Sequence, residues 1–477
     1  MTTQSAARRA INVELLNRLR DVVGGKRVSR SELEGVAYSR DMQTASVLET
    51  RNGHVARRPD FVVWPESTEE VSRILRLCNE VRMPVTPFGG GTGLDGDAAP
   101  DCGGVVLDMK RMNRLERISE LSCIGVCQPG IIGAHLEHDL NRQGYTLGHF
   151  PGSLGSSTLG GWLSTRGAGM AATTYGKIED MVVSLQVVLA DGAVLHTRTA
   201  PRRATGPDFN HLFIGSEGAL GVITRAHMRI HLLPEARYFR GLAFKTLEEG
   251  LTALRLILRA GMKPSFLRLA DEADVATNLK ALGVNVSGCL LALVFDGRPT
   301  QVDLYGRKAL EICRQNGGRD HGEEPARVWC EHRYAEFYRQ SPVFEEAGGV
   351  LEHLEAAAVW RDAAAVHRAV REATPGDVEL LANVPHAYPE GCGFLFTMVG
   401  KADNGDAAAF VEKTRNAALA AARGAGAVVS RSHGAAKGRG KTAADPAREI
   451  LLGVKKRLDP NQILNPGAFA VDPEKPC

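Results

Sequence analysis

Glycine is concentrated in three short stretches of the first half of the chain, and this feature constrains the fold more than any other. The stretches are Gly89–Gly96, Pro151–Gly169 and Gly215–Thr224. A residue without a side chain lets the backbone turn sharply and lets a ligand or a second backbone approach closely. The first half must therefore bring its regular elements together around loops that are built for turning or for binding.

The segments around these loops predict a mixture of strands and helices. Phe61–Trp64 is a short apolar run that predicts a strand. A helix is predicted to follow from Ser67, because Ser67–Glu70 has the pattern of a capping box and apolar residues then recur at helical spacing until Pro84. Asp191-Gly192 lies between two β-rich runs and predicts a hairpin.

After Pro234 strand-like runs alternate with helical segments. The strand-like runs are 241–244, 289–295 and 393–399, and the helical segments are 247–260 and 302–315. This alternation predicts a second sheet with helices on one face, and hence an α+β fold. We expect a first domain over residues 1–234 that is completed by residues 441–477, and a second domain over residues 235–440.

Composition excludes several classes of protein. Lys and Arg number 58 against 55 Asp and Glu, so the chain has no basic excess for binding nucleic acid. It has no run of about 18 apolar residues that could span a membrane and no apolar core of a secretory signal. Nine cysteines without a signal favour reduced thiols, and Cys123 and Cys127 lack a second pair at zinc spacing, so no metal is expected. These features predict a cytoplasmic protein.

The first two glycine stretches favour a phosphate-bearing ligand. Gly91–Gly96 matches the dinucleotide pattern G-x-G-x-x-G, but no helix pattern begins there, as that motif requires. Five glycines in Gly89–Gly96 can instead turn their amides toward an anion, although a plain surface turn is the alternative. The hydroxyl-rich Ser153–Gly169 would suit the phosphates and ribityl hydroxyls of a flavin, or equally a tightly packed strand and turn.

Several motifs together resemble a known family of flavoproteins. The motifs are Arg58–Asp60 with Pro65–Val71, the run PFGGGTG, and the TLGG and GSEGALGVIT segments, while Asp459–Gly467 resembles the family's C-terminal signature. In order and spacing they are similar to the PCMH-type FAD-binding domain of the vanillyl-alcohol oxidase superfamily. The resemblance implies an α+β fold of two domains, a PCMH-type FAD-binding domain and an α+β cap domain of the FAD-linked oxidase C-terminal type.

The same resemblance implies FAD as the cofactor. Because residues 85–100 contain no histidine for a covalent link, FAD is expected to be held noncovalently. The positions implied to contact it come from the three glycine stretches and their flanks: Pro87, Gly89, Gly90, Gly91, Thr92, Gly93, Pro151, Ser153, Thr158, Gly160, Gly161, Ser164, Thr165, Gly167, Glu217, Gly218, Gly221, Val222 and Ile223.

Within the superfamily the chain is most similar to the alkylglycerone-phosphate synthase (alkyldihydroxyacetonephosphate synthase) branch, above all between residues 148 and 234. That branch exchanges the acyl group of acyl-dihydroxyacetone phosphate for a long-chain alcohol through an adduct at flavin N5. The resemblance implies that Tyr388 and His433 are catalytic and that Arg339, His386 and Arg431 bind substrate. A lipid phosphate substrate is compatible with contact at a membrane surface, and a homodimer is compatible with the sequence.

Departures from the synthase pattern keep a second function open. The synthase has three histidines ahead of Gly434, whereas this chain has Arg431, Ser432 and His433. The alternative is an FAD-linked dehydrogenase or oxidase of a 2-hydroxy acid such as D-lactate or glycolate, or of another alcohol. Against it, the two-histidine metal site common in that branch is missing, because Asn383–Phe394 supplies only His386. Plainer interpretations also exist: Tyr388 capping a turn, His433 in a solvated loop and Arg339 as a surface charge.

Overall fold

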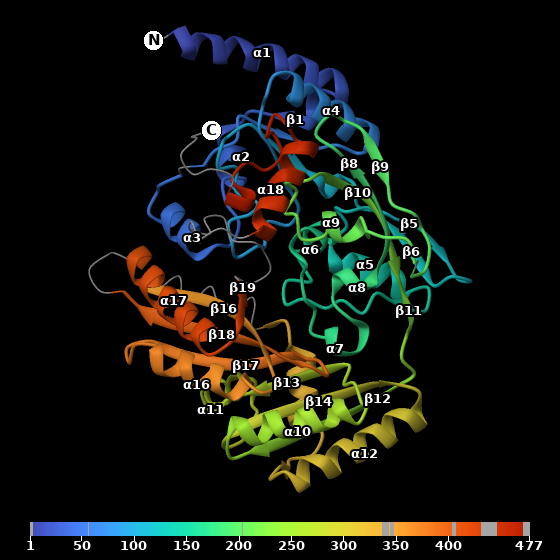
Figure 1. The fold of residues 1–477 in the computed structure, drawn as a ribbon, viewed down its shortest axis with the longest axis vertical. Helices are drawn as coiled ribbons and strands as arrows, with labels where there is room; N and C mark the ends of the chain where they lie inside the picture. The colour runs from blue at the N-terminus through green and yellow to red at the C-terminus, as the bar shows by residue number, and fades with distance from the viewer. Residues whose placement is uncertain are drawn as a thin grey trace.

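The computed structural model describes residues 3–55, 57–202, 204–335, 343, 348–402, 407–430 and 446–470. An upper part contains the N-terminal half together with the C-terminal helix, and a lower part is built on one large sheet (Figure 1). The mixed architecture confirms the predicted α+β class. Among the described residues, no helix combines the length and the apolar character needed to cross a membrane.

The first sheet has four strands in the order β1-β2-β4-β3, of which β2, β4 and β3 run parallel. Its elements are α1 (Thr3–Val23), β1 (Val28–Ser29), α2 (Glu32–Ala37), α3 (Thr44–Arg51), β2 (Phe61–Val63), α4 (Thr68–Glu80), β3 (Val85–Phe88) and β4 (Val105–Asp108). Apolar side chains of α1 and α4 pack on this sheet in one core. No helix begins in Gly91–Gly96, which confirms that the dinucleotide pattern there was a chance match.

Helix α4 confirms the predicted start signal in part. Ser67 Oγ accepts a hydrogen bond from the amide of Glu70 at 3.2 Å. The expected return bond of the capping box is wrong, because the Glu70 carboxylate accepts from the amide of Glu66, at 2.7 Å, and not from that of Ser67. Arg27 donates to both oxygens of the same carboxylate, at 2.7 and 2.8 Å, so a tertiary ion pair helps to orient it.

A second sheet of five antiparallel strands lies beside the first, in the order β5-β6-β10-β8-β9. Its strands are β5 (Leu115–Ser119), β6 (Ile124–Cys127), β8 (Val182–Val188), β9 (Val194–His196) and β10 (Val222–Arg229). The predicted hairpin is confirmed, since Val188 pairs with Val194 across the Asp191-Gly192 turn. The connecting elements are α5 (Gly133–Asn141), β7 (Tyr145–Thr146), α6 (Leu159–Thr165), α7 (Ala172–Tyr175), α8 (Ile178–Met181), α9 (Asn210–Phe213) and β11 (His231–Leu232).

The second half forms one sheet of eight antiparallel strands, in the order β15-β12-β14-β13-β17-β18-β16-β19. The strands are β12 (Ala236–Phe244), β13 (Phe266–Ala270), β14 (Cys289–Gly297), β15 (Arg319–Asp320), β16 (Gly349–Val359), β17 (Glu379–Ala387), β18 (Gly391–Lys401) and β19 (Val428–Ser430). Helices α10 (Leu247–Arg259), α12 (Pro299–Gln315), α16 (Ala363–Ala373) and α17 (Ala407–Gly424) cover one face. Helices α11 (Glu272–Asp274) and α13 (Glu324–His332) lie on the opposite side, so the prediction of helices on one face holds only for the four long helices.

The C-terminal segment returns to the first half of the chain. After α18 (Pro446–Leu458), Leu464 forms a parallel bridge with Val85 of β3, and the amide of Val85 donates to the carbonyl of Ile463 at 2.7 Å. Lys455 of α18 is 2% exposed, and its ammonium donates to the carbonyls of Ala219 and Leu464 at 2.8 and 2.7 Å. Its third acceptor is the buried Asp459 carboxylate. This node ties the C-terminal segment to the third glycine stretch.

Seven cysteines of the described chain are free thiols, and six of these are buried. Burial raises the pKa of Cys78 and Cys127 to about 12, so both thiols stay protonated at neutral pH. Cys102 is disulfide-bonded, and the expectation of reduced thiols is therefore wrong at that residue.

Candidate functional site

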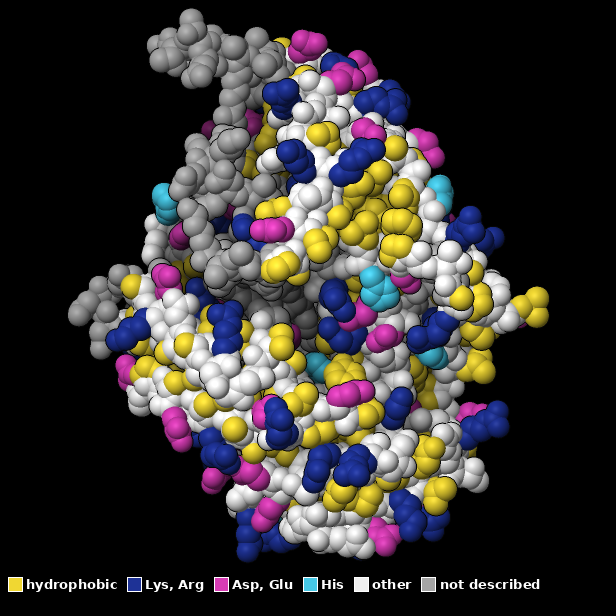
Figure 2. Space-filling model, viewed as in Figure 1, with side chains coloured by type: hydrophobic (Ala, Val, Ile, Leu, Met, Phe, Trp, Pro, Cys, Tyr) yellow, Lys and Arg dark blue, Asp and Glu magenta, His cyan; other side chains and the backbone are white. Residues whose placement is uncertain are grey.

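A cavity of about 630 Å³ lies between the glycine stretches of the first half and the face of the eight-stranded sheet opposite its four long helices. Its volume lies within the range of about 300–1,000 Å³ that is typical of small-molecule sites. On the face shown in Figure 2, basic, acidic and histidine side chains gather where the two parts of the molecule meet. The cavity is therefore the candidate functional site.

All positions that the sequence predicts to contact the cofactor line this one cavity. The first stretch contributes Pro87 and Gly89 to Gly93, the second contributes residues between Pro151 and Gly167, and the third contributes residues between Glu217 and Ile223. Segments up to 136 residues apart in sequence thus form one wall of the cavity, which we call its floor. Their contact with a cofactor stays a prediction, but the fold brings them together.

The first stretch has no room for side chains because it packs directly against the second. A Cβ on Gly90 would lie 2.2 Å from the carbonyl oxygen of Ser156, a distance that a real Cβ does not tolerate. Gly91 has φ +64°, in the left-handed region that glycine adopts without strain. The glycines therefore allow two backbone segments to meet at the cavity floor.

Two charged side chains that the sequence did not single out brace this loop. Asp41 lines the cavity, and its carboxylate accepts a hydrogen bond from the amide of Gly96 at 2.9 Å. Lys110 lies behind the loop and donates to the carbonyl of Gly89 at 2.9 Å. Its ammonium also forms an ion pair with Asp108 at 2.9 Å, so its charge beside the glycine cluster is compensated within the protein. Neither residue belongs to a local motif, so only the fold reveals them.

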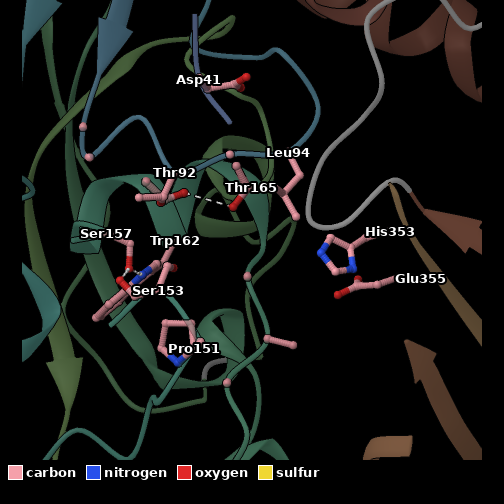
Figure 3. A pocket seen from close by; sticks show the side chains of 18 of the residues that line it. Asp41, Thr92, Leu94, Pro151, Ser153, Ser157, Trp162, Thr165, His353 and Glu355 are labelled. Atoms are coloured by element: carbon pink, nitrogen blue, oxygen red, sulfur yellow. Dashed lines mark hydrogen bonds between the residues drawn. The ribbon is translucent and has the colours of Figure 1, made fainter. Parts of the chain in front are cut away.

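The second stretch is held by a chain of hydrogen bonds around Trp162. The indole Nε1 donates to Ser157 Oγ at 2.8 Å, and Ser157 Oγ donates to the carbonyl of Ser153 at 2.9 Å. Thr158 accepts from the amide of Gly161 at 3.3 Å and begins α6. Figure 3 shows these side chains grouped on the glycine-loop side of the cavity. The hydroxyls that the sequence assigned to a ligand therefore also have structural partners.

The eight-stranded sheet forms the opposite wall. In the middle of β16, β17 and β18 alternate side chains face the cavity. Residues between them pack into the core under the helices: Leu354, Leu380, Ala382, Phe396 and Met398. Strand register arranges the cavity-facing side chains in three rows: Leu351, Val399 and Glu379; His353, Thr397 and Leu381; and Glu355, Leu395 and Asn383. The wall therefore combines aliphatic and polar groups.

Polar residues of this wall were missed by the sequence analysis. The His353 imidazole Nδ1 and Thr397 Oγ1 share a hydrogen bond of 3.0 Å. His353 and Glu355 lie two residues apart on one face of β16, and both point from the sheet toward the glycine loops (Figure 3). Asn383 is 3% exposed, and its Oδ1 has no hydrogen-bond partner among the described residues. A bound molecule would be the natural partner for that oxygen.

The residues predicted to act on substrate have mixed positions. His386 lines the cavity, whereas Tyr388 lies behind it in the β17–β18 turn, with its ring 5.7 Å from that of His386. The Tyr388 hydroxyl is buried and has no partner within the described chain. Burial raises the pKa of Tyr388 far above its ordinary value, so the phenol stays protonated. Arg339, Arg431 and His433 lie outside the described residues.

A search of the described residues finds no group of three or more His, Cys, Asp or Glu side chains arranged to hold a metal ion.

Two family models match the chain, one in each half. Residues 59–198 match an FAD binding domain, and residues 233–469 match the FAD linked oxidases, C-terminal domain. The second match begins close to Pro234, where the alternation of strands and helices begins. Together they include the first two glycine stretches and the whole eight-stranded sheet, whereas the third stretch, 215–224, lies between the two matches.

Three known proteins show how far the similarity extends. An alkyldihydroxyacetonephosphate synthase of Trypanosoma brucei brucei is 28% identical over 465 residues, which cover 89% of this chain and 75% of that protein. A probable mitochondrial D-lactate dehydrogenase of Danio rerio is 30% identical over 335 residues, 68% of this chain and 65% of the relative. A solved alkyldihydroxyacetonephosphate synthase structure superimposes with a TM-score of 0.81 at 25% identity, covering 95% of this chain and 84% of that one.

Proposed function

We propose that this chain, a member of the FAD-dependent enzymes that join a PCMH-type FAD-binding domain to an FAD-linked oxidase C-terminal domain, is a synthase. It would replace the acyl group of acyl-dihydroxyacetone phosphate by a long-chain alcohol. The observation that carries this proposal is the end-to-end similarity to synthases, which includes the half that forms the polar wall. FAD supplies the electrophilic N5 position that such an exchange requires.

The residues of the cavity fit FAD. The floor is a surface of backbone, because the glycines that form it bring their amides and carbonyls to the cavity without side chains in between. Amides of the first stretch can turn toward a pyrophosphate, and Lys110 braces that loop by donating to the carbonyl of Gly89. We propose that the three glycine stretches hold FAD noncovalently, a mode supported by the absence of histidine from residues 85–100.

Substrate would then lie between the floor and the sheet. Aliphatic side chains of the wall, such as Leu351 and Leu395, offer contacts for acyl and alkyl chains. We assign proton transfer to Tyr388 and His433, and recognition of the phosphate ester to Arg339, Arg431 and His386. Because burial keeps the Tyr388 phenol protonated at neutral pH, its hydroxyl would first act as a hydrogen-bond donor, and it would have to lose its proton to another base before it could accept one.

A second function is favoured by one specific observation. The relative from Danio rerio named as a D-lactate dehydrogenase reaches 30% identity. Oxidation of a hydroxy acid would need a base near the flavin, and His353 with its Thr397 hydrogen bond is a group of that kind. The two reactions differ in electron balance, since the exchange consumes no electron acceptor and the oxidation needs one.

Anaerobic absorbance spectroscopy of the purified FAD-loaded enzyme separates the two functions. Acyl-dihydroxyacetone phosphate is added first and a long-chain alcohol second, with D-lactate and glycolate in parallel cuvettes. The synthase is supported if the phosphate ester bleaches the flavin band and the alcohol alone restores it. Lasting bleaching by a hydroxy acid, reversed only by an electron acceptor, would replace the synthase by a dehydrogenase.

The substrate-binding role of Arg339 has its own test. Arg339→Ala is expected to raise the KM for the phosphate ester at least tenfold while the flavin content stays unchanged, because an arginine paired with phosphate contributes strongly to binding. An unchanged KM would remove Arg339 from the proposed site.

A further inference from the structure

Arg333, the residue after α13, lines the cavity in an aromatic surrounding. Its guanidinium carbon lies 5.7 Å from the ring centre of Phe150, 5.0 Å from that of Phe266 and 4.6 Å from that of Tyr334. Aromatic faces attract a cation and hold the plane of a guanidinium in a fixed orientation. Three segments far apart in sequence thus position one positive charge at the cavity.

The hydrogen bonds of Arg333 go to neutral acceptors. Its Nη1 donates to the carbonyl of Cys330, and its Nη2 donates to the Tyr334 hydroxyl at 3.2 Å. Its Nε is buried and has no partner among the described residues. The charge of Arg333 favours the ionised form of Asp296, but the Asp296 carboxylate forms its ion pair with Arg237, at 3.1 Å. No carboxylate in the described part of the chain forms an ion pair with Arg333.

Arg268 shows how the same cavity accommodates a compensated cation. Its Nε and Nη2 donate to the Asp274 carboxylate at 3.0 and 2.8 Å, and both residues are buried. A cation removed from water is costly unless a counter-charge accompanies it. Arg268 has that counter-charge in Asp274, whereas the described residues give Arg333 no ion pair, and an anionic ligand in the cavity would supply one.

We infer that Arg333 binds the oxyanion of the substrate, a phosphate or a carboxylate, and makes the cavity selective for anionic substrates. The planar fork of a guanidinium suits either group. The inference rests on the proposed function in one respect only, namely that a substrate occupies the cavity together with FAD. It adds a recognition residue to Arg339 and Arg431, which lie outside the described residues.

The test measures binding by isothermal titration calorimetry on the FAD-loaded enzyme. The ligands are dihydroxyacetone phosphate, D-lactate and the uncharged dihydroxyacetone. The variants are Arg333→Gln and Arg333→Lys, and the matched control is Arg327→Gln. Arg327 lies on α13, six residues before Arg333, and pairs with Glu323 at the surface. Both of those side chains are about half exposed, and Arg327 does not line the cavity.

Arg333→Gln is expected to raise the Kd of the bound anion about 10- to 100-fold, because a hydrogen-bonded charge pair is lost. Arg333→Lys should fall in between, since it keeps the charge and loses the fork. The Kd of dihydroxyacetone, the flavin content and the Tm should match those of the control. An unchanged Kd for the anions, an equal loss for dihydroxyacetone, or release of FAD from Arg333→Gln would each overturn the inference.

The two anions distinguish this inference from the proposed function. Arg333-dependent binding of D-lactate without any binding of dihydroxyacetone phosphate would support the inference and contradict the synthase. A Kd for dihydroxyacetone phosphate that is the same with and without Arg333 would contradict the inference and remain compatible with the synthase.

Discussion

Replacing Lys455 by methionine is the most informative perturbation of the fold, because this ammonium satisfies three buried acceptors at once. Methionine has a similar length but no donor, so the carbonyls of Ala219 and Leu464 and the carboxylate of Asp459 would all lose a hydrogen bond. Asp459 would keep only the amides of Ile463 and Leu464, at 3.0 and 2.8 Å, with its charge uncompensated.

The expected loss is large on the scale of protein stability. Breaking a buried ion pair by removing one partner costs about 3–5 kcal/mol. Each of the two carbonyls adds about 1 kcal/mol, so Lys455→Met should lower the free energy of unfolding by roughly 5–7 kcal/mol. This amount is comparable with the whole stability of a domain, about 5–15 kcal/mol. We therefore expect the first half to unfold at much lower guanidinium concentration and FAD to dissociate with it.

Guanidinium unfolding of FAD-loaded protein, followed by flavin fluorescence, provides the assay. Adding Asp459→Asn to Lys455→Met removes the stranded charge and should recover about 2 kcal/mol or more. The matched control is Lys308→Met, whose ion pair with Glu311 is more than half exposed and should change stability by under about 1 kcal/mol. A cost below about 1 kcal/mol for Lys455→Met, or a double variant without any recovery, would refute this reasoning.

Three further perturbations test other parts of the structure. Gly90→Ala is expected to lower FAD occupancy, measured by flavin absorbance, more than tenfold because its Cβ has no space. The control Gly453→Ala has open space around its Cβ and should leave the absorbance unchanged; equal occupancy in the two variants would contradict the close packing. Burial raises the pKa of Asp271, but the hydrogen bond from His367 and other contacts outweigh this effect and hold it below its ordinary value. Asp271→Asn should therefore cost about 3 kcal/mol at pH 7, and the difference in the free energy of unfolding should shrink as the pH falls below about 4, where the unfolded-state carboxyl becomes protonated; a pH-independent difference would be evidence against it. Tyr388→Phe removes a hydroxyl without a partner in the described chain, so the free energy of unfolding should change by less than about 1 kcal/mol. Turnover, measured by steady-state kinetics, should fall about 10²- to 10⁴-fold, and intact turnover would exclude a proton-transfer role.

The cavity floor could be predicted from sequence because its signals are local. Each glycine stretch is continuous, and the start of α4 at Ser67 depends on neighbours within one turn. Even there the Glu70 side chain departs from the local expectation, since Arg27, 43 residues earlier, pairs with it. Local patterns therefore identify elements and loops, but they do not show which distant partner a side chain takes.

The opposite wall could not be predicted because it depends on tertiary structure. His353, Glu355 and the other inward residues of β16 follow strand alternation, but alternation does not tell whether a strand face meets a cavity, water or core. Arg333 is a similar case. Its surroundings come from Phe150 and Phe266, and nothing near it in the sequence predicts that those rings would meet it.

The bridge between Val85 and Leu464 has a consequence for biosynthesis. About 380 residues separate the two partners, and the whole eight-stranded sheet is encoded between them. At a synthesis rate of about 5–20 residues per second, the first sheet waits roughly 20–75 s on the ribosome for its last partner. The later-encoded sheet can close before the earlier one is complete. Nascent chains should therefore acquire FAD only after the C-terminal helix has left the ribosome.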